Sequence, residues 1–298
     1  MEFEKEFSTE EQCREYLFKL RWPDGFMCPK CGHGKAWQTG AMEYKCQSCG
    51  HKTTAIAGTI FQGTHKPLTL WFRAIWYVTS QKNGASAQGL QKILGLGSYH
   101  TAWGWLHKLR RAMVRPGRDN LSGRVEVDET YLGAPEEGGK RGRGAEMKAL
   151  IVIAVEVDGR KLGRVRMSLI ENASANELHP FIDEVVEKGS TIVTDGWSGY
   201  SGISSKGYSH EIQIKKDDEA ALPHVHIVIS LLKRWILGTL QGSWSKDYIA
   251  YYLDEFSFRF NRRNSNSRGL LFYRLLQNAV QLKPVTYNDI QRHSSYIQ

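Results

Sequence analysis

The sequence predicts an α/β protein in which the main sheet is preceded by a small cysteine-rich module and a helical module. Three observations support this prediction. Two Cys-x-x-Cys pairs lie within the first 50 residues. Apolar residues then recur at helical spacing, and beyond Pro116-Gly117 the pattern changes to the alternating and apolar runs typical of strands. We therefore expect four parts: residues 1–54, 55–118, 119–280 and a C-terminal tail, 281–298.

The four cysteines of the first part have the spacing of zinc ligands. Cys28 and Cys31 form one pair, Cys46 and Cys49 the other, and 14 residues separate the pairs. Four thiolates at this spacing can close one tetrahedral site, which predicts a zinc ribbon with a short hairpin between the pairs. A redox dithiol needs only one pair, and this segment holds few apolar residues to fold it without a metal. The fifth cysteine, Cys13, is expected to be a small buried apolar residue.

Three short helices are predicted over residues 55–118. Turn residues separate them at Asn83-Gly84 and again over residues 95–98, and Ser86 and Ser98 are suited to cap the helices that follow. This is the layout of a helix-turn-helix DNA-binding domain.

The last of these helices ends in a basic run. Lys108, Arg110 and Arg111 lie there without a neighbouring acid, which suits contact with DNA phosphates. An ordinary helical bundle with a solvated basic end is an alternative that this region leaves open. The zinc ribbon just upstream favours the DNA-binding interpretation.

The third part is predicted to contain a mixed sheet. Its segments follow the order strand, strand, strand, helix, strand, strand, helix, helix, at about residues 123–133, 147–157, 161–170, 174–189, 190–197, 208–214, 224–240 and 246–263. Three antiparallel strands followed by further strands across a helix is the order of an RNase H-like α/β domain. The glycine-rich, charged residues 134–147 are expected to form a mobile loop.

Two aspartates stand at matching places in this sheet. Asp128 ends "VEVD" and Asp195 ends "TIVTD", and a turn follows each. In neighbouring strands both carboxylates would lie side by side at the edge of the sheet, where they could bind a divalent metal. An aspartate at a strand end is also a favoured turn residue, so either one alone would more often be structural. The pair favours a metal site.

A third ligand is expected from the helix that starts near Pro223. His226 and Lys233 are seven residues apart, close to two helical turns, so both project from one face. We expect His226 to complete the metal site and Lys233 to meet a phosphate. Glu219 and Glu255 are alternatives for the third ligand, since either would make a site of three carboxylates.

The composition agrees with a protein that handles nucleic acid. The 298 residues carry a net charge of +9, which favours a polyanionic partner. The N-terminus is acidic and polar, and no uncharged apolar run approaches 18 residues, so neither secretion nor membrane insertion is expected. Cysteines spaced for a metal favour a reducing compartment, and we expect a cytoplasmic, nucleoid-associated protein.

The chain resembles the bacterial insertion-sequence transposases of the "fifteen ninety-five" superfamily. The resemblance covers nearly the whole chain and is carried by "CPKCG", "CQSCG", "LGLGSYHTAW", "VEVDETYLG", "TDGWSGY" and "LPHVHIVISLLKRWILGTLQG". It implies a zinc ribbon ahead of a DDE-type catalytic domain with an RNase H-like fold. It also implies a catalytic set in which the first three residues hold magnesium or manganese: Asp128, Asp195, His226 and Lys233.

The implied activity is binding of transposon terminal inverted repeats, metal-dependent 3′-end cleavage and strand transfer into target DNA. The implied partner is double-stranded DNA, bound by a homodimer or a higher oligomer. Arg262 and Arg263, at the end of a late helix, could line the DNA path, although arginines there are often simply solvated. Two alternatives remain open: a domesticated, catalytically inactive DNA-binding regulator, and a structure-specific nuclease for branched DNA.

Overall fold

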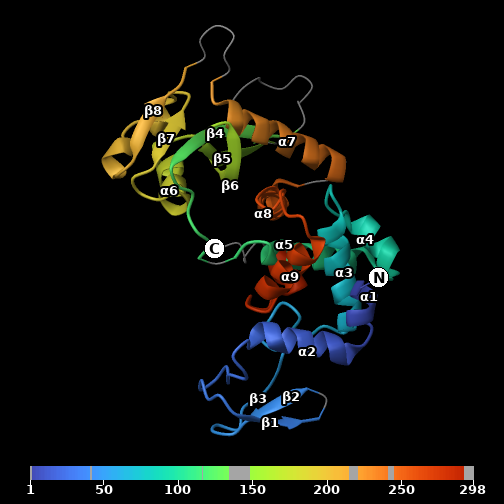
Figure 1. The fold of residues 1–298 in the computed structure, drawn as a ribbon. Helices are drawn as coiled ribbons and strands as arrows, with labels where there is room; N and C mark the ends of the chain where they lie inside the picture. The colour runs from blue at the N-terminus through green and yellow to red at the C-terminus, as the bar shows by residue number, and fades with distance from the viewer. Residues whose placement is uncertain are drawn as a thin grey trace. The chain divides into compact units, whose positions relative to one another are not determined.

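A computed structural model describes residues 2–40, 42–115, 117–133, 148–214, 221–240 and 245–291. The loop expected at 134–147 and the alternative ligand Glu219 lie outside these residues. The chain divides into two compact units (Figure 1), of which one comprises Met1–Arg115 with Ser265–Gln298 and the other Pro116–Asn264. Within the described segments, none of the helices combines the length and the apolar character that crossing a bilayer requires.

The first unit begins with two helices and a small antiparallel sheet, paired in chain order. These elements are α1 (Glu2–Glu6), α2 (Glu10–Arg21), β1 (Ala36–Thr39), β2 (Glu43–Cys46) and β3 (Lys52–Thr54). A capping box starts α2, because the Thr9 hydroxyl accepts from the Gln12 amide while the Gln12 side chain accepts from the Thr9 amide. The rings of Phe18 and Tyr44, 4.9 Å apart, pack α2 against the sheet. The hairpin expected between the cysteine pairs is confirmed as β1 and β2.

The rest of the first unit is helical: α3 (Leu68–Ser80), α4 (Ala87–Leu94), α5 (Tyr99–Ala112), α9 (Arg268–Ala279) and α10 (Tyr287–Gln291). The three helices expected from apolar spacing are confirmed as α3, α4 and α5. Ser86 caps α4 through a 3.0 Å bond from the Gly89 amide to its hydroxyl. Gly95 ends α4 with φ of 62°, a left-handed conformation that glycine adopts readily and that turns the chain toward α5.

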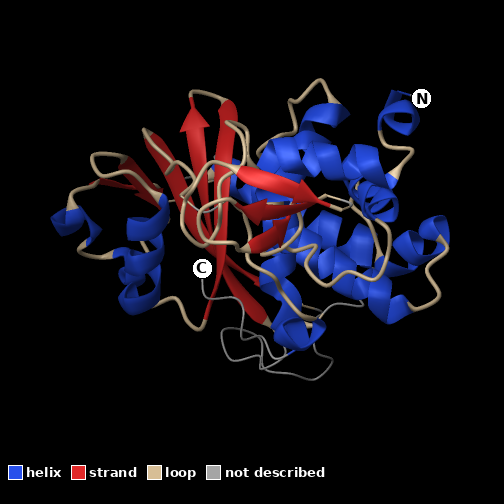
Figure 2. Cartoon of the chain, turned by 90° about the horizontal axis from the view of Figure 1, so that it is seen from below, coloured by secondary structure: helices blue, strands red, loops and turns tan. Residues whose placement is uncertain are grey.

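The second unit is built on a five-stranded sheet, shown by its red strands in Figure 2. Its elements are β4 (Arg124–Leu132), β5 (Ala149–Asp158), β6 (Lys161–Ile170), α6 (Ala175–Val185), β7 (Thr191–Thr194), β8 (Ser209–Ile212), α7 (Pro223–Leu240) and α8 (Ile249–Phe260). The strand order is β6-β5-β4-β7-β8. β4, β5 and β6 pair antiparallel, whereas β7 joins β4 and β8 joins β7 in parallel. This is the RNase H-like order, as predicted.

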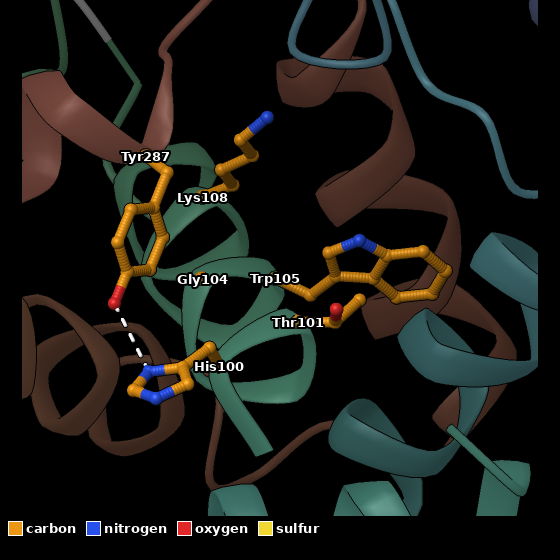
Figure 3. A pocket seen from close by; sticks show the side chains of 6 residues that line it. All are labelled: His100, Thr101, Gly104, Trp105, Lys108 and Tyr287. Atoms are coloured by element: carbon orange, nitrogen blue, oxygen red, sulfur yellow. Dashed lines mark hydrogen bonds between the residues drawn. The ribbon is translucent and has the colours of Figure 1, made fainter. Parts of the chain in front are cut away.

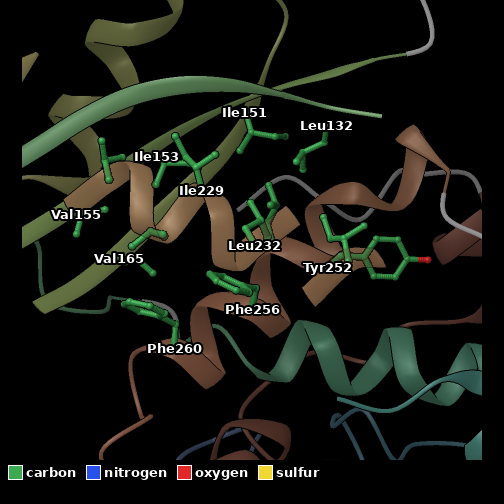
Figure 4. Packing of buried hydrophobic residues seen from close by; sticks show 14 of the residues in the cluster. Leu132, Ile151, Ile153, Val155, Val165, Ile229, Leu232, Tyr252, Phe256 and Phe260 are labelled. Atoms are coloured by element: carbon green, nitrogen blue, oxygen red, sulfur yellow. The ribbon is translucent and has the colours of Figure 1, made fainter. Parts of the chain in front are cut away.

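The two faces of the sheet carry separate hydrophobic clusters. One cluster joins Val125 and Val127 of β4 to α6. The other joins β5 to α7 and α8 through residues that include Ile153, Leu232 and Phe256 (Figure 4). Because side chains alternate along a strand, the residues that follow these two valines, Glu126 and Asp128, face α7.

The units do not follow the domain boundaries expected from sequence. Helix α9 belongs to the first unit, although the expectation assigned residues up to 280 to the sheet domain. The cause is the apolar side of α9, where Phe272 packs against Phe72 of α3 with ring centroids 5.7 Å apart. The expected tail also contains ordered structure, since Ile290 of α10 is fully buried.

Candidate functional site

The register of β4 and β7 brings Asp128 and Asp195 beside one another at the end of β7. Asp128 itself lies within β4, opposite Ile153 of β5, and the strand continues to Leu132, so the expectation that Asp128 ends a strand before a turn is wrong. Glu126 pairs with Val193 in the parallel ladder. Two residues further along each chain stand Asp128 and Asp195, so side chains that alternate at period two place both carboxylates on the face that α7 covers. Each carboxylate also accepts a backbone bond of 2.9 Å, Asp128 from the Glu129 amide and Asp195 from the Trp197 amide.

Helix α7 adds His226 to this site. His226 Nε2 lies 3.8 Å from Asp128 Oδ2, beyond hydrogen-bond distance. The His226 side chain is 56% exposed and that of Asp128 only 14%. Lys233 also lies on the exposed side of α7. The structure thus brings together the two residues Asp128 and His226, which are far apart in the sequence.

The environment of Asp128 is unfavourable for a negative charge. Burial raises the pKa of Asp128 to about 7, against the opposing effect of the Glu129 amide. The charges of Glu129 and Asp195 raise the pKa further, while Lys233 lowers it. Both Asp195 and Lys233 are therefore near enough to Asp128 to interact with it electrostatically.

These donors fit a divalent cation. A cation would offset the repulsion between these carboxylates, and carboxylate oxygens are its preferred ligands. Adjacent ligand atoms on one octahedral ion with bonds of about 2.1 Å lie about 3.0 Å apart, so the 3.8 Å between Asp128 Oδ2 and His226 Nε2 must shorten when both bind the same ion.

Glu255, the other described candidate for the third ligand, has a different role. Glu255 is fully buried in α8, and its Oε1 lies 2.7 Å from an Arg259 nitrogen one helical turn away. Its charge is therefore neutralised inside the core.

Two carboxylates beside the site were not singled out from the sequence. Glu126 is 3% exposed, and its carboxylate accepts from the backbone amides of His224 and Val225 at the start of α7. Glu129 accepts a 2.8 Å bond from the Tyr200 hydroxyl. The available signal was the run "VEVDE", in which Glu126 and Asp128 share one side of a strand, and only the position of α7 shows what Glu126 binds.

The four cysteines of the ribbon form a second cluster. Their four sulfurs lie within 4.8 Å of one another, and no other such group of three or more His, Cys, Asp or Glu ligands occurs among the described residues. The sulfurs of Cys28 and Cys49 are 3.7 Å apart, and those of Cys31 and Cys46 are 3.6 Å apart. Zinc bound tetrahedrally at about 2.3 Å would hold its sulfurs about 3.8 Å apart, so the cluster fits one zinc ion.

The basic residues expected to contact DNA differ in their surroundings. Arg110 is 3% exposed on the inner side of α5, so its guanidinium cannot reach a phosphate in this conformation, contrary to the expectation from sequence. Lys108 and Arg111 are half-buried. Arg262 stacks on the Phe258 ring, and Arg263 donates to the carbonyls of Leu162, Gly163 and Phe260. DNA contact by Lys108, Arg111, Arg262 and Arg263 stays a prediction.

Helix α10 covers part of α5, the helix expected to read DNA. A pocket of about 540 Å³ separates them, lined by His100, Thr101, Gly104, Trp105, Lys108 and Tyr287 (Figure 3). The Tyr287 hydroxyl lies 3.2 Å from His100 Nδ1, and the Tyr287 ring occupies the space above Gly104 that a side chain would fill. Trp105 is unavailable to DNA, because its ring stacks on Trp71 at 3.8 Å. The exposed part of α5 is its N-terminal end at Tyr99 and His100.

The fold and the two clusters define a class, the zinc-ribbon transposases with an RNase H-like domain. Residues 120–261 match the profile of the ISXO2-like transposase domain, and residues 8–52 match that of the transposase zinc-ribbon domain. Both profiles are those of the IS1595 group, and the chain belongs to this transposase family. The resemblance seen in the sequence is confirmed.

A relative from the archaeon Halobacterium salinarum is described as an uncharacterized protein in transposable element ISH50. It is 26% identical over 277 residues, which cover 86% of this chain and 92% of the relative. Because this relative is archaeal, the expected bacterial source stays a prediction.

Two solved structures are similar at low scores. The catalytic core domain of BIV integrase has a TM-score of 0.36 and 16% identity, covering 49% of this chain and 88% of its own. The Mos1 strand transfer complex has a TM-score of 0.32 and 10% identity, covering 80% of this chain and 82% of its own. The fold assignment therefore rests on the strand order.

Proposed function

We propose that this transposase binds the terminal inverted repeats of its element, cleaves their 3′ ends in a metal-dependent reaction and transfers them into target DNA. The observation that supports this most is the 3.8 Å approach of His226 Nε2 to Asp128 Oδ2, with Asp195 two residues beyond the β4–β7 ladder. We further propose that it acts in the cytoplasm as a homodimer or higher oligomer on DNA, since two transposon ends must be processed together.

The residues of this site have separate tasks in this proposal. Asp128 and Asp195 hold magnesium or manganese, with His226 as a neutral nitrogen ligand. Bound divalent ions supply the Lewis acidity that activates a water molecule and stabilises a leaving 3′ oxygen. Lys233, on the exposed side of α7, orients a phosphate of the cleaved strand. One zinc ion held by the four cysteines keeps the ribbon folded.

A donor plasmid tests the proposed function. The plasmid carries the DNA that flanks the coding sequence on both sides, and it is incubated with protein and Mn²⁺ or Mg²⁺. We expect nicks at two specific 3′ ends and, later, insertion of those ends into a second plasmid. Binding without cleavage would indicate an inactive regulator instead. Equal cleavage of any branched DNA would indicate a structure-specific nuclease.

His226 is expected to set the metal preference. We expect His226→Ala to slow cleavage about 100-fold or more, because loss of a residue that only supports a metal ligand already costs about 10- to 100-fold. His226→Glu and His226→Asn should retain more activity, and Glu should shift the preference from Mn²⁺ toward Mg²⁺ by adding an oxygen ligand and a charge. Cleavage rates over a range of each metal concentration measure this.

Ser230→Ala is the matched control, because Ser230 is exposed on the same side of α7. Its cleavage rate should equal that of the wild type in both metals. Full activity in His226→Ala would show that the third ligand lies elsewhere.

We also propose that α4 and α5 form a helix-turn-helix that binds the terminal repeat. In such domains the first residues of the second helix contact base edges, and Tyr99 is 48% exposed at that position. Tyr99→Ala should change the preferred sequence, whereas Lys92→Ala, at an exposed position of α4, should weaken binding to all sequences alike. Selection from a random DNA pool at two salt concentrations separates these effects. An unchanged preference in Tyr99→Ala would place base reading on another surface.

A further inference from the structure

The start of α7 is held by a buried carboxylate from the neighbouring strand. Glu126 Oε2 accepts from the amides of His224 and Val225 at 2.9 and 2.8 Å, and Oε1 lies 2.7 Å from His224 Nδ1. The first amides of a helix have no partner within it and carry partial positive charge, which a carboxylate satisfies. Glu126 therefore caps α7 from outside the helix.

The chain enters α7 through a second constrained residue. Leu222 has a φ of 52°, a left-handed conformation that is uncommon for residues other than glycine. Its side chain is fully buried in the cluster beneath α7, and its carbonyl accepts from the His226 amide at 3.2 Å. Non-glycine residues keep such conformations where their surroundings determine them strongly. The buried side chain of Leu222 and its bond from the His226 amide thus hold the backbone of the first turn of α7.

The anchor and the metal ligand belong to the same strand. Glu126 and Asp128 are two residues apart on one side of β4, about 7 Å along the strand. On α7, the residues that Glu126 binds, His224 and Val225, directly precede His226. The contacts of Glu126 therefore hold the backbone that leads directly into His226, whose Nε2 lies 3.8 Å from Asp128 Oδ2.

We propose that Glu126 is a positioning residue, which holds the N-terminus of α7 so that His226 and Asp128 can bind the same cation. This inference rests on the proposed metal site. Two other roles are conceivable for a carboxylate at this place. A general structural role would lower stability without a specific effect on the cation, and a purely electrostatic role would strengthen cation binding regardless of His226.

A double-mutant cycle on metal affinity separates these roles. The full-length protein, with its cysteines loaded with zinc, is titrated with Mn²⁺ alone, and free Mn²⁺ is measured by electron paramagnetic resonance. We expect Glu126→Gln to weaken Mn²⁺ binding about tenfold, in the range found for residues that support metal ligands. In the His226→Ala background the same change should have less than about a twofold effect, because the ligand that Glu126 positions is gone.

A second variant distinguishes geometry from charge. Glu126→Asp keeps the negative charge but is one methylene shorter, so it cannot hold both amides in the same way. We expect Glu126→Asp to weaken Mn²⁺ binding about as much as Glu126→Gln, and again only when His226 is present. The matched control is Glu156→Gln, which breaks the pair with Arg164 on β6 and should leave Mn²⁺ affinity unchanged.

Equal losses of Mn²⁺ affinity on Glu126→Gln with and without His226 would overturn the proposal in favour of an electrostatic role. Wild-type Mn²⁺ affinity in Glu126→Asp would overturn it in the same way. Far-ultraviolet circular dichroism reports the folding of each variant. If Glu126→Gln is unfolded, the Mn²⁺ affinity of Glu126→Asp with and without His226 tests the proposal instead. Loss of folding in both variants would show a structural role and overturn the proposal. Absence of Mn²⁺ binding in the wild type would remove the metal site itself, a failure seen before any variant is compared.

Discussion

Asp128→Asn is expected to abolish cleavage while DNA binding is unchanged. The substitution removes a proposed metal ligand beside His226, and metal assistance contributes several kcal/mol, or about 10³-fold or more in rate. The proposed DNA-reading helices belong to the other unit, so affinity for the terminal repeat should not change. Cleavage of the donor plasmid and a gel-shift titration measure the two properties side by side, and Asp195→Asn should behave alike.

The stability of the metal-free variant checks that the loss is catalytic. Burial raises the pKa of Asp128 from 3.8 to about 7, so the folded state favours the protonated form. The protonated Asp128 carboxyl therefore contributes its full stability to the folded state below pH 3.8. This contribution is lost as the pH rises through the folded-state pKa of about 7. Asparagine has no charge to bury, and we expect Asp128→Asn to unfold at a higher temperature than the wild type at pH 8 in chelator.

Asp158→Asn is the matched control for the aspartate. Asp158 ends the apolar strand β5 and is exposed at a hairpin where Gly159 follows, and Asn-Gly suits this turn as well as Asp-Gly. This variant should cleave at the wild-type rate. Residual cleavage by Asp128→Asn within about tenfold of the wild type would contradict the assignment of Asp128 as a metal ligand.

Cys46→Ser is expected to unfold the ribbon and release its zinc. Structural zinc contributes about 10 to 16 kcal/mol in small zinc modules, which exceeds the stability of most domains. The ribbon sheet has strands of only three or four residues and few buried apolar side chains, so it has little else to hold it. Metal analysis should find one zinc per wild-type chain and less in the variant. Limited proteolysis should cut the variant before residue 55.

The sheet unit should stay folded in Cys46→Ser, because it has its own clusters on both faces of the sheet. Cys13→Ala is the control for loss of a cysteine. Cys13 is fully buried in α2, where burial raises the pKa of its thiol to about 12, so it is not a ligand and its removal should leave the zinc content at one. Wild-type protein purified without zinc, but with an intact ribbon, would contradict a structural role for the metal.

Much of the secondary structure could be predicted because its signals are local. The alternation of "RVEVDETYL" and the apolar run "ALIVIAVEV" predicted β4 and β5, and Asp158-Gly159 predicted the hairpin to β6. Ser86 predicted the start of α4 through its hydroxyl. Such signals depend on residues a few positions apart, whereas the assignment of α9 to the first unit depends on contacts with α3, almost 200 residues earlier in the chain.

The sequence by itself determined the candidate ligands, because cysteine pairs, aspartates after apolar runs and a histidine at helical spacing are patterns of residue type and interval, although it placed Asp128 at the end of a strand and not within β4. Only the tertiary structure decided which of the remaining charged residues serve the site. Burial on the inner side of α5 removes Arg110 from DNA, and a contact with Arg259 neutralises Glu255. In the sequence Glu126 resembles any polar residue of a strand, and only the structure shows that it binds the start of α7. The physical reason is that the cost of a charge depends on what surrounds it, and those surroundings come from segments distant in the chain.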